Sequence, residues 1–148
     1  MQIKDVMRRT VETVTPDTLL REAARKMNEH GVSLVAVCEG PMVVGLLTSR
    51  DITVRATAQG CDPRRTRVRD VMMNPSICGR ENQNISEAEH VMRHWRLRRL
   101  PVLNQHGRLV GVISLQDVLR KVSVGKRTTR KSIAKRDGQT KRQGPATT

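Results

Sequence analysis

The sequence predicts an α/β (α+β) fold made of two βαββα repeats related by pseudo-twofold symmetry. One short phrase occurs twice, as "GLLTSRD" at 45–51 and as "GVISLQD" at 111–117. A shift of 65 residues (70 minus 5) also superposes "DVM" at 5–7 on "DVM" at 70–72. A unit of about sixty residues buries too little surface to be stable alone, so we expect the two copies to pair around a shared core.

The elements of the first copy follow from periodicity and turn signals. A short strand at 11–14 is followed by a stretch at 15–31 whose apolar residues recur at helical spacing. Asp17 or Thr18 is expected to cap this helix, and Gly31 is expected to end it. The copy is completed by strands at 32–37 and 42–48 and by a second helix from Ser49 to Gln59 that stops at Gly60.

The second copy repeats the same order of elements. Its first helix lies within 82–96, with apolar residues that include Met92 and Trp95. Asn84 with Glu87, or Ser86 with Glu89, has the spacing of a capping box at its start. The copy is completed by strands at 97–103 and 108–114 and by a last helix that begins at 115.

Charge is concentrated at the end of the chain. We divide the sequence into a first repeat at 1–60, a linker at 61–69, a second repeat at 70–122 and a disordered basic tail at 123–148. Residues 119–148 hold ten Lys or Arg and one acid, a charge of +9 out of the total +14. Such an arm can bind a polyanion such as nucleic acid through residues 120–148; alternatively it keeps the protein in solution or contacts an acidic protein.

The sequence lacks the residues that are typical of several classes of protein. Cys38, Cys61 and Cys78 form no CxxC pair, so reduced thiols are expected, and no stretch is apolar enough to cross a membrane. His90 and His94 lie four residues apart but fall on the polar side of their helix, so no metal site is predicted. No GxSxG, phosphate-binding Gly-Lys-Ser/Thr or HExxH motif is present, so we expect a non-enzymatic cytoplasmic protein without catalytic residues.

Residues 1–122 resemble a pair of cystathionine β-synthase (CBS) domains, the Bateman module. The resemblance rests on "VM" before each copy, on "RRLPVL" in the second copy, and on Gly-apolar-apolar-[Ser/Thr]-x-x-Asp at the end of both third strands. Small stand-alone bacterial proteins of this family are especially similar. The resemblance implies a regulatory protein, expected to be a homodimer, that senses AMP, ADP, ATP, NAD(H) or S-adenosylmethionine in two clefts between the repeats and requires no cofactor.

The repeated phrase can be read in two ways. Thr48 lies where a strand ends and a helix begins, where free backbone N–H groups favour an anion, and Asp51 can accept both hydroxyl hydrogens of a ribose. Ser114 and Asp117 repeat the arrangement. The same spacing is that of a capping box, so the alternative is a purely structural helix start. The two roles are compatible, because a capping hydroxyl can still face a ligand.

Other site residues are predicted from side-chain chemistry, for the arginines, and from family position, for the adenine slot. Arg50, Arg98 and Arg99 are candidates for phosphate contact, although a surface Arg is usually only a solvated charge. The chain departs from the family pattern at Ser49, where a second acid is common, and at Ala36, where Pro is common. The adenine slot is expected to be lined by Val14, Val35, Ala36, Val37, Ile77, Leu100, Pro101 and Val102, which are otherwise ordinary core residues.

A second hypothesis comes from another class of protein. The basic tail would bind nucleic acid, and the CBS core would serve mainly as a dimerising scaffold. Removal of the residues after Val122 distinguishes the two hypotheses, because nucleotide binding should survive it and polyanion binding should be lost.

Overall fold

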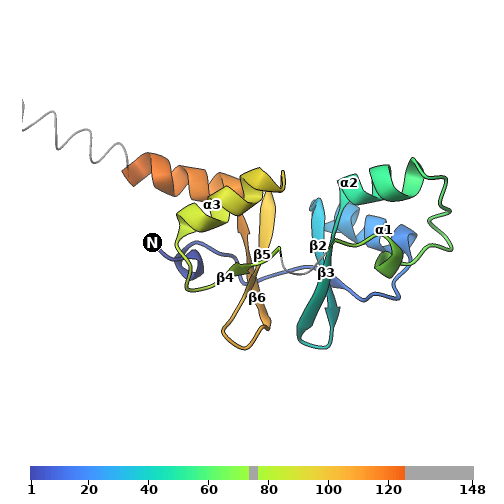
Figure 1. The fold of residues 1–148 in the computed structure, drawn as a ribbon, viewed down its shortest axis with the longest axis horizontal. Helices are drawn as coiled ribbons and strands as arrows, with labels where there is room; N and C mark the ends of the chain where they lie inside the picture. The colour runs from blue at the N-terminus through green and yellow to red at the C-terminus, as the bar shows by residue number, and fades with distance from the viewer. Residues whose placement is uncertain (74–76, 126–148) are drawn as a thin grey trace, which may run out of the picture.

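The computed structural model describes residues 1–73 and 77–125, and these residues contain the two predicted repeats (Figure 1). Each repeat contributes one three-stranded sheet, ordered β1-β2-β3 and β4-β5-β6. The elements are η1 (Ile3–Asp5), β1 (Thr13–Val14), α1 (Leu20–His30), β2 (Leu34–Glu39), β3 (Met42–Thr48), α2 (Ser49–Asp51), η2 (Ile52–Thr57), η3 (Val68–Asp70), β4 (Gly79–Arg80), α3 (Ile85–His94), β5 (Arg99–Leu103) and β6 (Leu109–Ser114), followed by a helix at 115–125.

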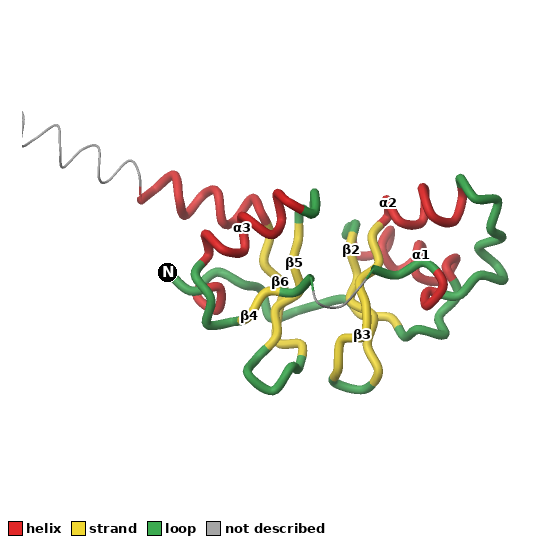
Figure 2. The backbone as a smooth tube through the Cα atoms, viewed as in Figure 1, coloured by secondary structure: helices red, strands yellow, loops and turns green. Residues whose placement is uncertain are grey.

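The two sheets have the same topology and nearly the same register. In each, the short first strand pairs in parallel with the second, and the second pairs antiparallel with the third. Val37 lies opposite Gly45 in one sheet, as Val102 lies opposite Gly111 in the other. Figure 2 shows the sheets next to each other at the centre and the helices toward the outside. The predicted mixed fold of two βαββα repeats is confirmed.

The β2 strand is buried on both faces, which joins the two repeats. Val35 and Val37 pack in one cluster with Leu20 and Met27 of α1. Leu34, on the opposite face of the strand, packs in a second cluster that is built mostly from the second repeat. An apolar face that neither repeat could cover alone is therefore shared between them.

The α1 helix ends as predicted but begins differently. Gly31 ends it with a left-handed backbone, φ 61°. The predicted cap at Asp17 or Thr18 is wrong, because the N-cap residue is Leu19, whose side chain cannot accept a hydrogen bond. The carbonyls of Thr66 and Pro63 accept the N–H groups of the first two helical residues instead, at 3.0 and 3.1 Å.

Two further helix predictions are corrected. Residues 49–57 are helical, but Ile52–Thr57 form a π-helix with wider hydrogen bonds, such as that from the Ala58 N–H to the Thr53 carbonyl at 2.9 Å. Asn84 does cap α3, since its Oδ1 accepts the N–H of Ser86 at 3.0 Å. Neither of the reciprocal capping boxes proposed for this helix forms.

The first residues of each repeat pack against the other repeat. Arg8 exchanges two backbone hydrogen bonds of 2.8 Å with Val112 of β6, and Met73 exchanges bonds of 3.1 and 2.7 Å with Leu46 of β3. Ile3 likewise lies in the core cluster of the second repeat. Because residues of each repeat pack against the other repeat, this packing does not test the predicted boundaries at residues 60 and 70, which stay predictions.

These crossings explain why the repeated phrase begins with Gly. A Cβ on Gly111 would lie 2.7 Å from the Arg8 carbonyl oxygen and 2.8 Å from the Met7 sulfur. A Cβ on Gly45 would clash with the Met72 side chain and lie 3.1 Å from the Met73 carbonyl oxygen. Both glycines therefore let a crossing segment lie directly on the sheet.

Substitution of Gly111 by Ala should destabilise the protein. The nearest obstacle is a backbone carbonyl held in the β6 pairing, so relief requires backbone movement, and urea denaturation should give a loss of about 1–3 kcal/mol. Gly45→Ala should lose less, because its closest obstacle is a flexible methionine side chain. Gly125→Ala is the control, since its Cβ meets no atom within 4 Å. Equal stability of the Gly111 and Gly125 variants would contradict the crossing account.

Two cysteines are half-buried near the contact between the repeats. Burial raises the pKa of the Cys38 thiol and raises that of Cys78 to about 12, where the neighbouring Cys38 adds a smaller repulsion. Cys78 packs against the core cluster of the second repeat. Both thiols therefore lose their proton less readily in the folded protein than in the unfolded one.

Alkaline pH should weaken the fold through Cys78. The unfolded thiol ionises near its ordinary pKa of 9.0, whereas the folded one keeps its proton up to about 12. Its stabilising contribution is thus complete below pH 9 and is lost as the pH rises toward 12. The free energy of unfolding, measured in urea at pH 8, 9 and 10, should fall less steeply in Cys78→Ala. An equal change of slope in Cys61→Ala would contradict this prediction.

Candidate functional site

In the first repeat, the phrase forms a complete capping box at the junction of β3 and α2. The Thr48 Oγ1 accepts the N–H of Asp51 at 3.1 Å. The Asp51 Oδ2 accepts the N–H of Thr48 at 2.9 Å and the Thr48 hydroxyl at 2.8 Å. Its other oxygen, Oδ1, lies 3.9 Å from Nε of Arg55. The capping role is thus observed, and Oδ1 is the carboxylate oxygen with the weaker partner.

The same phrase has different partners in the second repeat. The Ser114 Oγ accepts the N–H of Asp117 at 3.1 Å, which is half of a capping box. The Asp117 Oδ2 instead lies 3.7 Å from Nε of Arg8, a residue of the segment that crosses from the first repeat. The Asp117 side chain is 20% exposed, against 10% for Asp51. The second carboxylate is therefore less enclosed and less firmly held.

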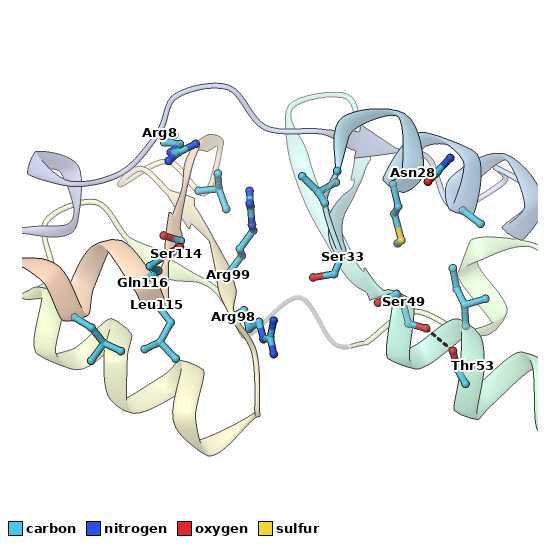
Figure 3. Close-up of a pocket in the computed structure, with 17 residues that line it drawn as sticks. Arg8, Asn28, Ser33, Ser49, Thr53, Arg98, Arg99, Ser114, Leu115 and Gln116 are labelled. Atoms are coloured by element: carbon cyan, nitrogen blue, oxygen red, sulfur yellow. Dashed lines mark hydrogen bonds between the residues drawn. The ribbon is translucent and has the colours of Figure 1, made fainter.

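Two cavities open between the repeats, and each combines the same two parts. The Asp51 cavity, of about 630 Å³, joins the first repeat's phrase, including Thr48 and Asp51, to the end of α3. The Ser114 cavity, of about 1000 Å³, joins the second repeat's phrase to the end of α1, including Asn28 and Gly31 (Figure 3). The pseudo-twofold axis thus relates the cavities as it relates the repeats.

Arginine side chains dominate the charge of both cavities. Among the described residues, those that line the Ser114 cavity include Arg8, Arg98 and Arg99 and no acidic residue. Arg98 and Arg99 also line the Asp51 cavity, as do Ser33 and Ser49. Figure 3 shows the two arginines across from the two serines, at the gap between the repeats. Further guanidinium groups in the Asp51 cavity come from Arg50, Arg55 and Arg96, against the single carboxylate of Asp51.

Both cavities therefore favour an anion. Guanidinium groups present several N–H donors in a planar fork that matches the oxygens of phosphate. The Thr48 and Ser114 hydroxyls stand at helix starts, where the helix dipole adds positive potential. A phosphorylated ligand with neighbouring hydroxyl groups would meet donors for its phosphate in both cavities, and a carboxylate acceptor in the Asp51 cavity.

The predicted site residues do not all meet in one place. Thr48, Arg50, Asp51 and Arg99 line the Asp51 cavity, and Ser114 and Arg99 line the Ser114 cavity, beside which Asp117 pairs with Arg8. The predicted adenine-slot residues are all buried and line neither cavity, and their role in a slot stays a prediction: Val14, Val35, Ala36, Val37, Ile77, Leu100, Pro101 and Val102.

Sequence reasoning missed several residues of the cavities. Arg8 and Met73 are 65 positions apart, and each lines one cavity, the Ser114 and the Asp51 cavity respectively. The repeat shift relates them, but nothing local indicates that each segment crosses to the other repeat. Trp95 and Arg96 line the Asp51 cavity as well. Trp95 was expected on the apolar side of its helix, yet it is 49% exposed because α3 ends one residue before it.

The described residues contain neither a metal-binding cluster nor a membrane-spanning helix. Among residues 1–73 and 77–125, no three His, Cys, Asp or Glu side chains gather in a way that could hold a metal ion. Within the same ranges no helix is long and apolar enough to cross a bilayer. Of the basic residues predicted to bind a polyanion, Arg120 and Lys121 lie exposed on the last helix, and residues 126–148 lie outside the described part.

The two caps should differ in their contribution to stability. Thr48→Ala removes a reciprocal capping box and should cost about 1 kcal/mol of unfolding free energy. Ser114→Ala removes a single accepted hydrogen bond and should cost less. Both are measured by urea denaturation, with Thr57→Ala as an exposed control. A larger loss for Ser114→Ala than for Thr48→Ala would be inconsistent with the observed caps.

Comparison with known proteins matches this chain to CBS domain proteins. A family model described as the CBS domain matches residues 3–56 and 68–124. The CBS domain-containing protein YhcV of Bacillus subtilis is 39% identical over 116 residues, covering 78% of this chain and 81% of YhcV. Protein MK0525 of Methanopyrus kandleri is 36% identical over 81% of this chain, which spans only 62% of the length of MK0525.

Solved structures show the same architecture. The crystal structure of Hypoxic Response Protein I with two coordinated zinc ions superposes with a TM-score of 0.73 at 30% identity, covering 81% of this chain and 98% of that one. The structure of CBSX2 in complex with AMP superposes with a TM-score of 0.70 at 23% identity, covering 84% of this chain and 98% of CBSX2. At that identity, the likeness to CBSX2 concerns the fold alone.

Proposed function

This chain is a member of the CBS domain family with a tandem pair of CBS repeats, and from that premise we propose that it binds adenosine-containing nucleotides between the repeats. The protein is a CBS-pair regulatory module. AMP, ADP and ATP are the proposed ligands, with NAD(H) and S-adenosylmethionine as further members of the same chemical class. The module would bind its ligand without transforming it.

One observation carries this proposal: each cavity places the start of a helix beside several guanidinium groups, at the contact between the repeats. In the Asp51 cavity, the partner of Asp51 Oδ1 among the described residues is Arg55 at 3.9 Å, so this oxygen can accept hydrogen bonds from ribose hydroxyls. Arg98 and Arg99 can neutralise the phosphate in either cavity. AMP in the structure of CBSX2, a protein of the same fold, supports this class of ligand.

A ligand between the repeats would act on their relative orientation. Each cavity has walls from both repeats, so binding free energy depends on how the repeats are placed. The crossing segments at Arg8 and Met73 connect each phrase-bearing strand to the opposite repeat. Val54 and Leu119 are exposed on the helices that follow the two phrases, each at the rim of one cavity, and either could take part in the proposed homodimer contact. A change in orientation would thereby reach the dimer contact.

Calorimetric titration of the full chain with AMP, ADP, ATP, NAD(H) and S-adenosylmethionine tests this function. At least one ligand should bind, and Asp51→Ala should weaken it by about tenfold or more, since hydrogen bonds to a charged group are lost. The Asp117 carboxylate is paired with Arg8 in the free protein. Asp117→Ala should weaken binding in the Ser114 cavity when the ribose replaces Arg8 as the partner of this carboxylate.

The matched control is Asp62→Ala, which removes a carboxylate that pairs with Arg65 and lines neither cavity. Its affinity should equal that of the unaltered protein. The absence of binding of every ligand at millimolar concentration would refute nucleotide sensing. Binding that is unaffected by Asp51→Ala and Asp117→Ala together would refute the ribose role of the phrase.

A further inference from the structure

The two cavities differ at the point where the first helix of each repeat ends. In the Asp51 cavity, this end contributes Trp95 and Arg96. The residues 65 positions earlier are His30 and Gly31. Gly31 lines the Ser114 cavity without offering a side chain, and His30 is turned to Glu12, its Nδ1 3.3 Å from a carboxylate oxygen. The backbones of the two repeats are thus related by pseudosymmetry, but the side chains at this point differ between the two cavities.

Arg96 stands in a backbone conformation that favours glycine. Its φ is 55°, close to the 61° of Gly31, and no other non-glycine residue in the described ranges has a positive φ. A side chain at this position is strained, whereas the helix could end equally well with the glycine that the first repeat uses. Strain of this kind is retained at functional sites when the side chain contributes something the fold does not need. Here that side chain is a guanidinium group lining the Asp51 cavity.

Trp95 provides the aromatic surface that the rest of the chain lacks. The sequence holds one Trp and no Phe or Tyr. The indole is half exposed and lines the same cavity as Thr48 and Asp51. Its ring meets His94 edge-on, at 5.2 Å between centroids and 83° between planes. Because about half of the Trp95 surface stays exposed beside this contact, a planar base can stack on the indole.

We infer that Trp95 and Arg96 make the Asp51 cavity the one of the pair that recognises the base of a nucleotide as well as its phosphate. The base stacks on the Trp95 indole, and the phosphate is held by Arg96 together with the other guanidinium groups of the cavity. The described residues that line the Ser114 cavity include arginines and no aromatic ring, so it binds phosphate without selecting the base. This inference rests on the proposed nucleotide binding and adds which cavity discriminates and through which residues.

Two variants of the full chain separate the two contacts. Arg96→Gly should raise the melting temperature, because it relieves the strained backbone, and should weaken AMP binding by about tenfold, because a charge-assisted phosphate contact is lost. Binding of adenosine, which has no phosphate, should not change. Trp95→Leu should weaken AMP by about tenfold and leave ribose 5-phosphate unchanged, since only the stacking contact is removed. Arg64→Gln, an exposed loss of one charge outside both cavities, is the control for net charge.

Trp95 is also the reporter, because it is the sole tryptophan. Its fluorescence should change on titration with AMP and not with ribose 5-phosphate, while calorimetry follows the binding of both. Calorimetric binding of AMP without a fluorescence change, or with full affinity in Arg96→Gly, would overturn the inference and leave the proposed function standing. A fluorescence change that follows protein concentration and not AMP would overturn it in favour of a contact between copies. Absence of calorimetric binding of AMP would overturn the inference, and absence of binding of every proposed ligand would overturn the proposed function as well.

Discussion

The architecture depends on one constraint, the close approach of each repeat's entry segment to a glycine in the other repeat. The Arg8 backbone lies on Gly111, and the Met72 side chain and the Met73 backbone lie on Gly45, so a Cβ on either glycine would meet an atom closer than 3.0 Å. The backbone hydrogen bonds to Val112 and Leu46 are possible only because of that approach. These two crossings hold the sheets in a fixed relation, and the cavities exist because the sheets are so held.

Shared arginine side chains connect the two cavities. Arg98 and Arg99 line both, so a phosphate bound in one lowers the positive potential available in the other. Arg8 adds a second connection, because it belongs to a crossing segment and also pairs with Asp117. A charge bound near either phrase therefore acts on both repeats, which is what a regulatory pair requires.

Sequence reasoning recovered what depends on local order and missed what depends on long-range packing. The repeat shift, the β3 strand and the end of α1 at Gly31 follow from periodicity and turn chemistry, and all are observed. The cap at Asp17 or Thr18 was wrong because distant carbonyls replace it. The π-helix at Ile52–Thr57 has the same residue types as an α-helix, so composition could not predict it. The phrase was placed correctly at a helix start, but the crossings that bring Arg8 and Met73 to the cavities have no local signal.

The most direct test of the account is a crystal structure of the full chain grown with AMP. The account predicts AMP between the repeats, with its ribose hydroxyls within hydrogen-bond distance of Asp51 and its phosphate within reach of Arg98 or Arg99. AMP bound outside both cavities, or cavities that stay empty at a concentration where calorimetry detects binding, would contradict it.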